Sequence, residues 1–360
     1  MSGSEPVARL LAIALCLFAV LVPAAMAQPD LNRRIGVTVA DAGVPGYRFE
    51  TLRLASADGQ RHYRLWLAVP RVPAPAAGYP ALWMLDGNAA LMETPAALLA
   101  EIGKAPHPPV LVYVAYDNDL RIDADARAFD YTPALAVSAD VTPPETLGGR
   151  REGGADAFLD LLTGPMRAAV AARVPLDTAR QALWGHSYGG LFTLHALFVK
   201  PDAFSTYAAV DPSLWWGHGY LLEEEARRRL PRHAPDVWLL TGDGEAVRGK
   251  GPPGRTPEQV AAVRRERAKA PPDAAPALVS RLQSAGSGAD LHRLPGLSHG
   301  QTLGASLPIV MRRLAGLPVS AGEVARRSHG ARTNGKARRR RDGGPFAFQV
   351  PRVVQRDAGA

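Results

Sequence analysis

The chain has 360 residues, 47% of them hydrophobic, which is enough for a substantial core in one large or two modest domains. Its formal net charge is +8, but residues 325–360 hold ten Arg or Lys and two Asp, so this segment alone carries a net +8. The remainder is close to neutral. Its composition excludes a broad polyanion-binding surface, and we predict no nucleic-acid partner.

The first residues are typical of an export signal. Arg9 precedes an apolar run at 10–22, and an A-x-A cleavage pattern ends at residue 27. We expect a signal peptide over 1–27 and a periplasmic or secreted mature protein without a stable membrane anchor, the alternative being an uncleaved anchor. The one cysteine, Cys16, lies inside this segment, so the mature chain has no thiol for a disulfide or a nucleophile.

Four stretches in the first third of the chain have the patterns of β-strands. Residues 47–55 and 62–69 alternate apolar and polar side chains on either side of a turn, which predicts a hairpin of half-buried strands. Residues 79–85 and 109–115 are continuously apolar, as expected for strands buried on both faces. Because helix-like segments separate such runs, we predict an α/β fold with a mostly parallel central sheet and helices on both faces.

Helical spacing of apolar residues occurs at 90–102 and 155–172. Two polar segments interrupt the pattern. Residues 118–150 carry charges of both signs and several prolines, and loops of this length in a compact domain are often functional. Residues 249–272 are rich in Gly, Pro and Arg and include a predicted charged helix at 256–268. The two segments could form two walls of a substrate cleft, the alternative being solvated surface insertions, and for the second segment we favour the solvated insertion.

One short motif points to chemistry. The sequence Gly-His-Ser-Tyr-Gly around Ser187 fits G-x-S-x-G, the nucleophile elbow of α/β-hydrolases. A strand-like run at 182–184 precedes it and a helix-like segment at 191–199 follows, which is the order that projects the serine Oγ into a cleft. Gly185 and Gly189 flank the turn because side chains there would clash across it. We predict that Ser187 is an acyl-transfer nucleophile.

A serine hydroxyl needs a general base within hydrogen-bond reach. In α/β-hydrolases the partners follow in the order Ser, acid, His. His299 follows a predicted last strand at 289–294, in a loop flanked by Gly and Pro, and is the predicted base. The acid stays open: Asp243 ranks first, Glu245 second and Asp211 third, and a Ser–His pair can work alone where a backbone carbonyl orients the imidazole.

An oxyanion intermediate needs two preorganised N–H donors. We predict the backbone N–H of Tyr188, the residue after the nucleophile, and that of Asn88, in the loop after the strand at 79–85. The sequence has no metal-ligand motif, and no G-x-G-x-x-G or P-loop follows a strand. We therefore expect neither a metal nor a cofactor.

Five ordered blocks resemble one known family: LDGN at 85–88, DYTP at 130–133, GHSYGGL at 185–191, PSLWW at 212–216 and GLSHG at 296–300. Over residues 40–316 the chain resembles the esterase-D-type esterases, and among these most resembles the periplasmic siderophore (enterobactin and salmochelin) esterases. The resemblance implies an α/β-hydrolase fold and hydrolysis of carboxylic esters through Ser187 and His299, acting as a dyad without a dedicated acid.

The wider family also contains feruloyl esterases, S-formylglutathione hydrolases and mycolyl transferases, so a feruloyl-type esterase or an acyltransferase is an alternative. A non-enzymatic binding module is another, which the retained elbow and histidine loop disfavour. The predicted organisation is a hydrolase domain at 28–318 and a basic, disordered tail at 319–360.

A catecholate siderophore substrate would be anionic and aromatic. Arg121 and Arg127 are candidates to bind its charge through charge-assisted hydrogen bonds, the alternative being salt bridges within the protein. Trp215 and Trp216 are candidates to stack on its rings, the alternative being core packing.

Overall fold

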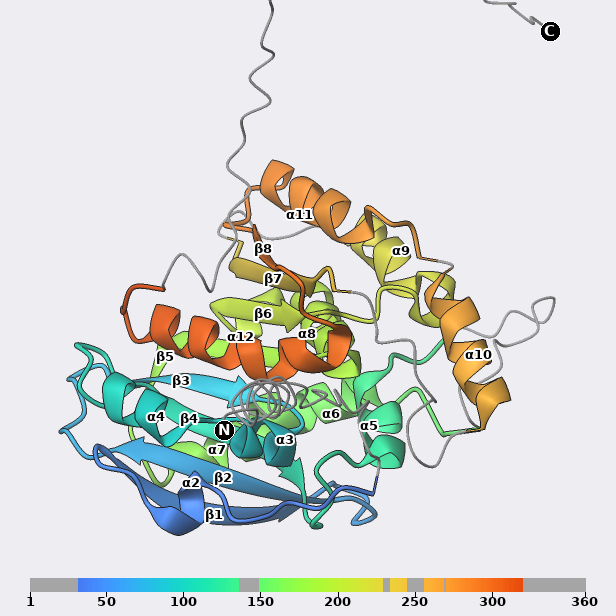
Figure 1. Ribbon diagram of the computed structural model, residues 1–360. Helices are drawn as coiled ribbons and strands as arrows, with labels where there is room; N and C mark the ends of the chain where they lie inside the picture. Colours follow the sequence, from blue (N-terminus) through green and yellow to red (C-terminus); the bar gives the residue numbers. More distant parts are fainter. Residues whose placement is uncertain (1–31, 136–148, 229–233, 245–255, 269, 320–360) are drawn as a thin grey trace, which may run out of the picture. The chain divides into compact units, whose positions relative to one another are not determined.

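The computed structural model describes residues 32–135, 149–228, 234–244, 256–268 and 270–319 (Figure 1). The predicted signal peptide at 1–27, Glu245, and all but the first residue of the predicted tail at 319–360 lie outside these ranges. No helix in the described part of the chain is both long enough and apolar enough to cross a membrane.

A sheet of eight strands runs through the described residues in the order β1-β2-β4-β3-β5-β6-β7-β8 (Figure 1). The strands are β1 (Tyr47–Ala55), β2 (His62–Pro70), β3 (Tyr79–Met84), β4 (Val110–Tyr116), β5 (Leu176–His186), β6 (Thr206–Val210), β7 (Asp236–Gly242) and β8 (Asp290–Leu294). β1 pairs with β2, and β2 with β4, in the antiparallel sense. The remaining pairs are parallel, which confirms the predicted hairpin and the mostly parallel sheet.

The central strands are buried on both faces. In β4, Val110, Val112 and Val114 enter one hydrophobic cluster, whereas Leu111 and Tyr113 enter a second. Successive side chains of a strand point to opposite faces, so these two clusters are the cores on the two sides of the sheet. Every residue of this strand is buried, which explains its continuously apolar sequence.

Helices cover both cores. They are α2 (Val39–Ala42), α3 (Gly87–Met92), α4 (Ala96–Ile102), α5 (Ala124–Tyr131), α6 (Ala155–Leu161), α7 (Arg167–Ala171), α8 (Tyr188–Val199), α9 (Tyr220–Arg227), α10 (Pro257–Arg267), α11 (Ala274–Ser284) and α12 (His299–Leu314). Buried residues of α6, α8 and α11 join the first cluster, and those of α3, α4 and α12 join the second. Figure 1 shows α4 and α12 on the viewer's side of the strands.

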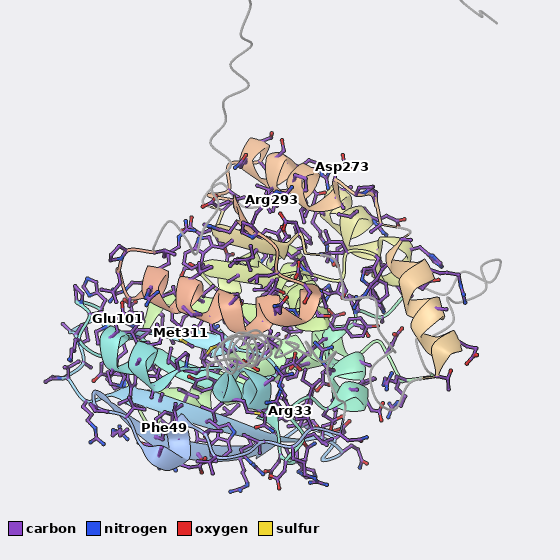
Figure 2. All side chains as sticks on the ribbon, in the orientation of Figure 1. Arg33, Phe49, Glu101, Asp273, Arg293 and Met311 are labelled. Atoms are coloured by element: carbon purple, nitrogen blue, oxygen red, sulfur yellow. The ribbon has the colours of Figure 1, made fainter. Side chains whose placement is uncertain are left out.

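An ion pair joins α4 to α12. Arg312 Nη2 lies 2.8 Å from Glu101 Oε2, and Figure 2 labels Glu101 beside Met311 where α4 meets α12. Met311 is fully buried in the second cluster, whereas both partners of the ion pair are partly exposed, so the pair lies at the edge of this core.

Prolines explain where the structure departs from the predicted helices. The stretch predicted at 90–102 is two helices, α3 and α4, because Pro95 has no N–H to donate and disfavours helical backbone before it. The stretch predicted at 155–172 is helical throughout, but Leu162–Met166 is π-helical around Pro165. Four further helices, α2, α5, α9 and α11, had no counterpart among the predicted ones.

The functional candidates follow the carboxyl ends of the parallel strands. Ser187 follows β5, Asp211 follows β6, Asp243 follows β7 and His299 lies shortly after β8. Parallel strands bring these ends to one edge of the sheet, which is where open α/β sheets bind their ligands.

Candidate active site

Ser187 occupies a strained turn between β5 and α8, with φ 61° and ψ −114°. A Cβ atom on Gly185 would lie 2.2 Å from the carbonyl oxygen of Gly189, so only glycine fits at this position. The N–H of Ser187 donates to the carbonyl of Val210, 2.9 Å away, which ties the turn to β6. The strand–turn–helix order predicted from the motif is confirmed.

The hydroxyl of Ser187 lies 3.5 Å from Oγ of Ser213, which is buried at 1% exposure. The backbones of these residues also meet, because the N–H of Ser213 donates to the carbonyl of Ser187 at 3.2 Å. Within the described ranges, no hydrogen bond joins Ser187 to His299. The sequence interpretation assigned no role to Ser213; its one signal was a hydroxyl in an otherwise apolar block after β6.

The sequence predicted that His299 lies in a loop. In the structure it is instead the first residue of α12. Ser298 and Gln301 form a capping box, in which the N–H of Ser298 donates to Oε1 of Gln301 at 2.8 Å. The spacing of apolar residues had predicted that this helix begins at residue 302. The capping box makes it begin three residues earlier, at His299. The helix terminus therefore gives the imidazole a defined backbone position.

The carboxylate that reaches His299 belongs to Asp211, with Oδ2 3.7 Å from Nδ1 of the imidazole. Asp243, ranked first from the sequence, is exposed, and its Oδ1 accepts a hydrogen bond from the N–H of Gly296 at 2.7 Å. Glu245 lies outside the described residues. The structure thus brings the third-ranked acid to the histidine, while Asp243 stabilises the turn after β8.

Asp211 is held by two further donors. Its Oδ1 accepts from the N–H of Gly242 at 3.0 Å, and its Oδ2 accepts from Oγ1 of Thr302 at 2.5 Å. Burial raises the pKa of Asp211 to about 6, although the bonds from Thr302 and Gly242 favour the charged form. At neutral pH the carboxylate is therefore mostly ionised. Thr302, the second residue that the sequence interpretation missed, gave no local signal.

A second imidazole adjoins the first. The carbonyl of His299 accepts a hydrogen bond from Nε2 of His186 at 2.7 Å, and the two rings have centroids 4.7 Å apart. Burial lowers the pKa of His186 to about 3. Burial, the adjacent imidazole of His186 and the positive charge of Arg267 also move the pKa of His299 well below its ordinary value. His299 is thus neutral at pH 7, the form in which an imidazole accepts a proton.

The same groups test the prediction of no metal. His186, Asp211 and His299 offer ligand atoms within 4.8 Å of one another. However, Nε2 of His186 already donates to a carbonyl, and the Asp211 oxygens accept from Thr302 and Gly242. A metal ion on Nε2 of His186 would have to displace its proton and break the bond to the carbonyl, so the arrangement fits a set of acid–base groups better than a metal centre.

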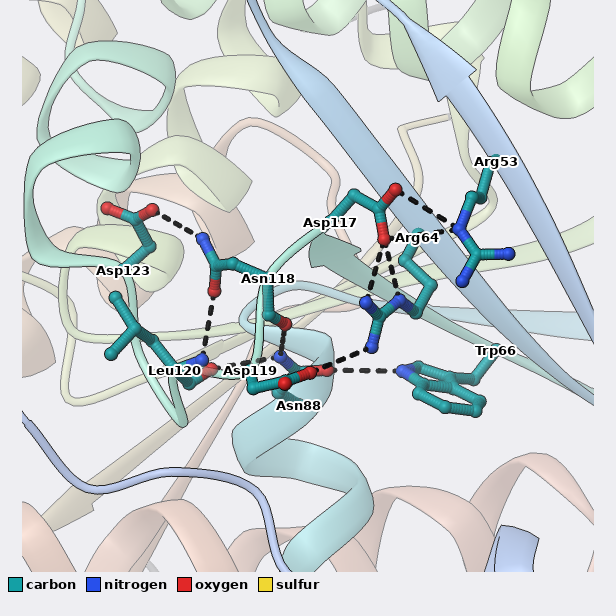
Figure 3. A network of polar contacts seen from close by, with 9 residues as sticks. All are labelled: Arg53, Arg64, Trp66, Asn88, Asp117, Asn118, Asp119, Leu120 and Asp123. Atoms are coloured by element: carbon teal, nitrogen blue, oxygen red, sulfur yellow. Dashed lines mark hydrogen bonds and ion pairs between the residues drawn. The ribbon is translucent and has the colours of Figure 1, made fainter.

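The predicted oxyanion donors lie at the starts of two helices. Tyr188 is the first residue of α8, and Asn88 lies in the first turn of α3. Oδ1 of Asn88 accepts from Trp66 Nε1 at 3.1 Å, and Nδ2 donates to the carbonyls of Asn118 and Leu120 at 3.0 and 2.9 Å (Figure 3). These bonds engage the side chain, so the prediction that Asn88 contacts an oxyanion rests on its backbone N–H alone.

Both arginines predicted to bind substrate are in internal ion pairs. Arg121 Nη2 lies 3.0 Å from Oε1 of Glu93, and its side chain is 10% exposed. Arg127 donates to both carboxylate oxygens of Asp86 at 2.9 Å, and its side chain is 12% exposed. This geometry matches salt bridging within the protein, because the charges are already balanced by neighbouring carboxylates.

The adjacent residues Trp215 and Trp216 lie in different environments. Trp216 is 3% exposed and donates to Oε1 of Glu152 at 3.2 Å, so it packs in the core. Trp215 lines a cavity of about 180 Å³ together with His299 and Arg267. Arg267 belongs to α10 and lies 6.0 Å from the centre of the Trp215 ring. Arg267 is exposed, as expected for a solvated surface segment, but it also borders the cavity, which agrees with the alternative that 249–272 forms a wall of a substrate cleft.

A mostly parallel sheet covered on both faces, with a serine in a strained turn after β5 and a histidine after β8, defines an α/β-hydrolase. The chain belongs to the esterase family whose model, described as "Putative esterase", matches residues 56–265.

Sequence similarity to two esterases supports the same family assignment. The chain is 40% identical over 207 residues to the apo-salmochelin esterase of Escherichia coli O6:H1, an alignment that covers 58% of this chain and 64% of the relative, just under two thirds of its length. It is 30% identical over 204 residues to the ferri-bacillibactin esterase BesA of Bacillus subtilis, covering 55% of this chain and 69% of that one.

Solved structures give the same result. The enterobactin and salmochelin hydrolase IroE has a TM-score of 0.58 and 30% identity, covering 77% of this chain and 99% of that chain. A complex of enterobactin hydrolase IroE with DFP has a TM-score of 0.60 and 31% identity at the same coverage. These similarities confirm the resemblance to siderophore esterases that was inferred from the sequence blocks.

Proposed function

We propose that this protein is an exported serine esterase that hydrolyses siderophore lactones of the kind named for its relatives. The observation that carries the proposal is the strained, glycine-flanked turn of Ser187 at the sheet edge that also holds His299 and Asp211. Similarity to a salmochelin esterase and to an enterobactin and salmochelin hydrolase supports the substrate class.

In this mechanism Ser187 Oγ attacks the ester carbonyl while Nε2 of His299 takes its proton. The carboxylate of Asp211 stabilises the imidazolium that forms. The backbone N–H groups of Tyr188 and Asn88 hold the oxyanion. His299 then returns the proton to the leaving alcohol, and a water activated by the same imidazole releases the acid from the acyl-enzyme.

The protonation states on this pathway support the assignment. Burial keeps the pKa of His299 well below its ordinary value, so the base is neutral before attack. The pKa of Asp211, raised by burial to about 6, leaves the carboxylate ionised at pH 7. Ser213, 3.5 Å from Ser187 Oγ, is suited to orient the nucleophile hydroxyl before the base engages it.

The experiment that tests the proposal compares wild type with Ser187→Ala on p-nitrophenyl acetate and butyrate. We expect the variant to lose at least about 10⁴-fold in kcat/KM, because the nucleophile is removed. Both proteins are then given enterobactin-like trilactones and feruloyl esters, with and without a competing alcohol, to separate siderophore hydrolysis from feruloyl hydrolysis and acyl transfer. Wild-type turnover by Ser187→Ala would refute the serine mechanism.

Export is part of the proposal and has its own measurement. The pattern at 1–27, with its A-x-A cleavage site, supports removal of a signal peptide after residue 27. The intact mass of the protein recovered from the periplasm or medium of a producing bacterium should correspond to a chain beginning at Gln28. Recovery of the full-length chain in the membrane fraction would instead identify an uncleaved anchor.

A further inference from the structure

Arg127 connects two turns that lie far apart in the sequence. It projects from α5, in the segment that the sequence marked as a long excursion. Its Nε and Nη2 bind the two carboxylate oxygens of Asp86 at 2.9 Å each, a bidentate pair. The same Nη2 donates to the carbonyl of His186 at 3.2 Å. One guanidinium therefore holds the turn after β3 and the residue before the nucleophile.

Both of these turns are strained. Asp86 has φ 49° and Ser187 has φ 61°, values that non-glycine residues rarely adopt. Strained residues persist where surrounding contacts determine their geometry, and they concentrate at active sites. Arg127 contacts Asp86 directly and reaches Ser187 through the preceding carbonyl, so it supplies such a contact to both turns.

Aromatic rings enclose the same guanidinium. Its carbon lies 5.5 Å from the centre of the Tyr131 ring and 5.4 Å from that of Tyr188. The hydroxyl of Tyr131, also from α5, accepts a hydrogen bond from the N–H of Asp86 at 3.1 Å, which gives the turn after β3 a second contact. Arg127 thus touches the residues on both sides of Ser187 and the residue that precedes α3.

The two proposed oxyanion donors belong to these same turns. Tyr188 follows Ser187, and Asn88 lies two residues after Asp86. We infer that Arg127 is a positioning residue of the esterase, which fixes the spacing of the two oxyanion donors by bridging Asp86 and the carbonyl of His186. This inference rests on the proposed function, because it assumes that an oxyanion forms at Ser187.

Burial favours a positioning role over a purely stabilising one. The side chains of Arg127 and Asp86 are 12% and 2% exposed. Desolvating two charges offsets much of their attraction, so buried ion pairs often add little net stability compared with apolar residues. Their fixed bidentate geometry is what an apolar pair cannot supply.

The inference predicts a specific kinetic change in Arg127→Met. Oxyanion donors act on the transition state more than on bound substrate, so kcat should fall with little change in KM. A misplacement of about 1 Å costs about 10²-fold in rate, and we expect a loss of that order on p-nitrophenyl butyrate. Arg127→Lys keeps the charge but not the fork, and should recover only part of the loss.

The matched control is Arg121→Met. Arg121 is a similarly buried arginine in the neighbouring segment. It makes a single contact with the partly exposed Glu93, and no hydrogen bond joins it to the elbow in the described chain. It should lower the melting temperature without lowering kcat by more than about threefold, the change expected when only stability is affected. Asp86→Asn, which removes the other half of the bridge, should reproduce the kcat loss of Arg127→Met, and the double variant should lose little more.

Two results would overturn the inference. One is a kcat of Arg127→Met within about threefold of wild type, which would make it equivalent to the Arg121 control. The other is a raised KM with unchanged kcat, which would indicate direct substrate binding. If Arg127→Met is insoluble, Arg127→Lys and Asp86→Asn decide by the same criteria. Failure of the proposed function is recognised separately, because Ser187→Ala would then retain wild-type turnover.

Discussion

The carboxylate of Asp211 lies 3.7 Å from Nδ1 of His299. This separation exceeds a hydrogen bond, so in the free protein the carboxylate acts on the imidazole as a nearby negative charge. Its oxygens are meanwhile held by Gly242 and Thr302, from two other elements. Thr302 belongs to α12, the helix that begins at His299, so the proposed acid is fixed relative to the histidine without a direct hydrogen bond to its ring.

We expect Asp211→Asn to lower kcat at pH 7 by about 10- to 100-fold, less than the roughly 10⁴-fold seen where an acid is hydrogen-bonded to the histidine of a triad. Asp243→Asn is the matched control. It removes a carboxylate that binds the N–H of Gly296 and should change kcat less than about twofold, within the usual range for a surface substitution. Steady-state kinetics on p-nitrophenyl butyrate measure kcat for both variants. A larger loss of kcat in Asp243→Asn than in Asp211→Asn would identify Asp243 as the acid.

The pH profile provides an independent check. The pKa of Asp211 is raised by burial to about 6, and the charged form is the one that stabilises the imidazolium. Activity should therefore fall as the pH drops through about 6 and the carboxylate becomes protonated. Asp211→Asn should lack this limb. An unchanged acid limb in the variant would assign the titration to another group.

Trp215 and Trp216 should respond differently to alanine. Trp215 lines the cavity beside His299, so Trp215→Ala should raise KM for aromatic esters severalfold through lost stacking, worth about 1 kcal/mol. Trp216 is buried, and Trp216→Ala should cost about 3–5 kcal/mol of unfolding free energy. Kinetics and urea denaturation of both variants measure this. Equal effects on KM would show that the distinction is wrong.

His195 should make stability depend on pH. Its Nδ1 lies 2.8 Å from Glu224 and its Nε2 lies 2.9 Å from Asp156, joining α8 to α9 and α6. Burial by itself lowers the pKa of His195, but the hydrogen bonds to these carboxylates outweigh it and raise the pKa above its ordinary value. The stabilisation is therefore complete below the unfolded-state pKa of about 6.5 and is lost as the pH rises through the folded-state pKa.

Melting temperatures from pH 6 to pH 9 test this relation. Wild type should lose about 2–4 °C more over this range than His195→Gln, the shift that about 1 kcal/mol produces in a domain of this size. His62→Gln, on an exposed position of β2, should follow wild type. Parallel curves for wild type and His195→Gln would show that His195, with its partners Glu224 and Asp156, does not titrate in this range.

Gly185→Ala should be strongly destabilising. Its Cβ would lie 2.2 Å from the Gly189 carbonyl oxygen and 2.7 Å from Oγ1 of Thr193, so the turn or α8 must shift. We expect a loss at or above the upper end of the roughly 1–3 kcal/mol that overpacking costs. Gly164→Ala, whose Cβ would meet nothing within 4 Å, should be neutral or slightly stabilising. Denaturant unfolding of both variants gives the comparison.

Local patterns determined much of the fold from the sequence. The apolar runs of β3 and β4, the alternation in β1 and β2, and the elbow around Ser187 were all predicted, because strand period and turn sterics act between residues close in the chain. The spacing of apolar residues gave wrong helix boundaries where a proline or a capping box determined them. Pro95 divides one predicted helix, and Ser298 with Gln301 starts another at His299.

Only the tertiary structure decided which side chains meet. Asp243 and Asp211 both follow parallel strands, but only Asp211 has its carboxylate within 4 Å of His299. Arg127 pairs with Asp86, and adjacent Trp215 and Trp216 separate into cavity and core. These outcomes depend on the direction in which each side chain leaves its backbone and on what packs against it. Both are set by segments distant in the sequence, so no local pattern carries them.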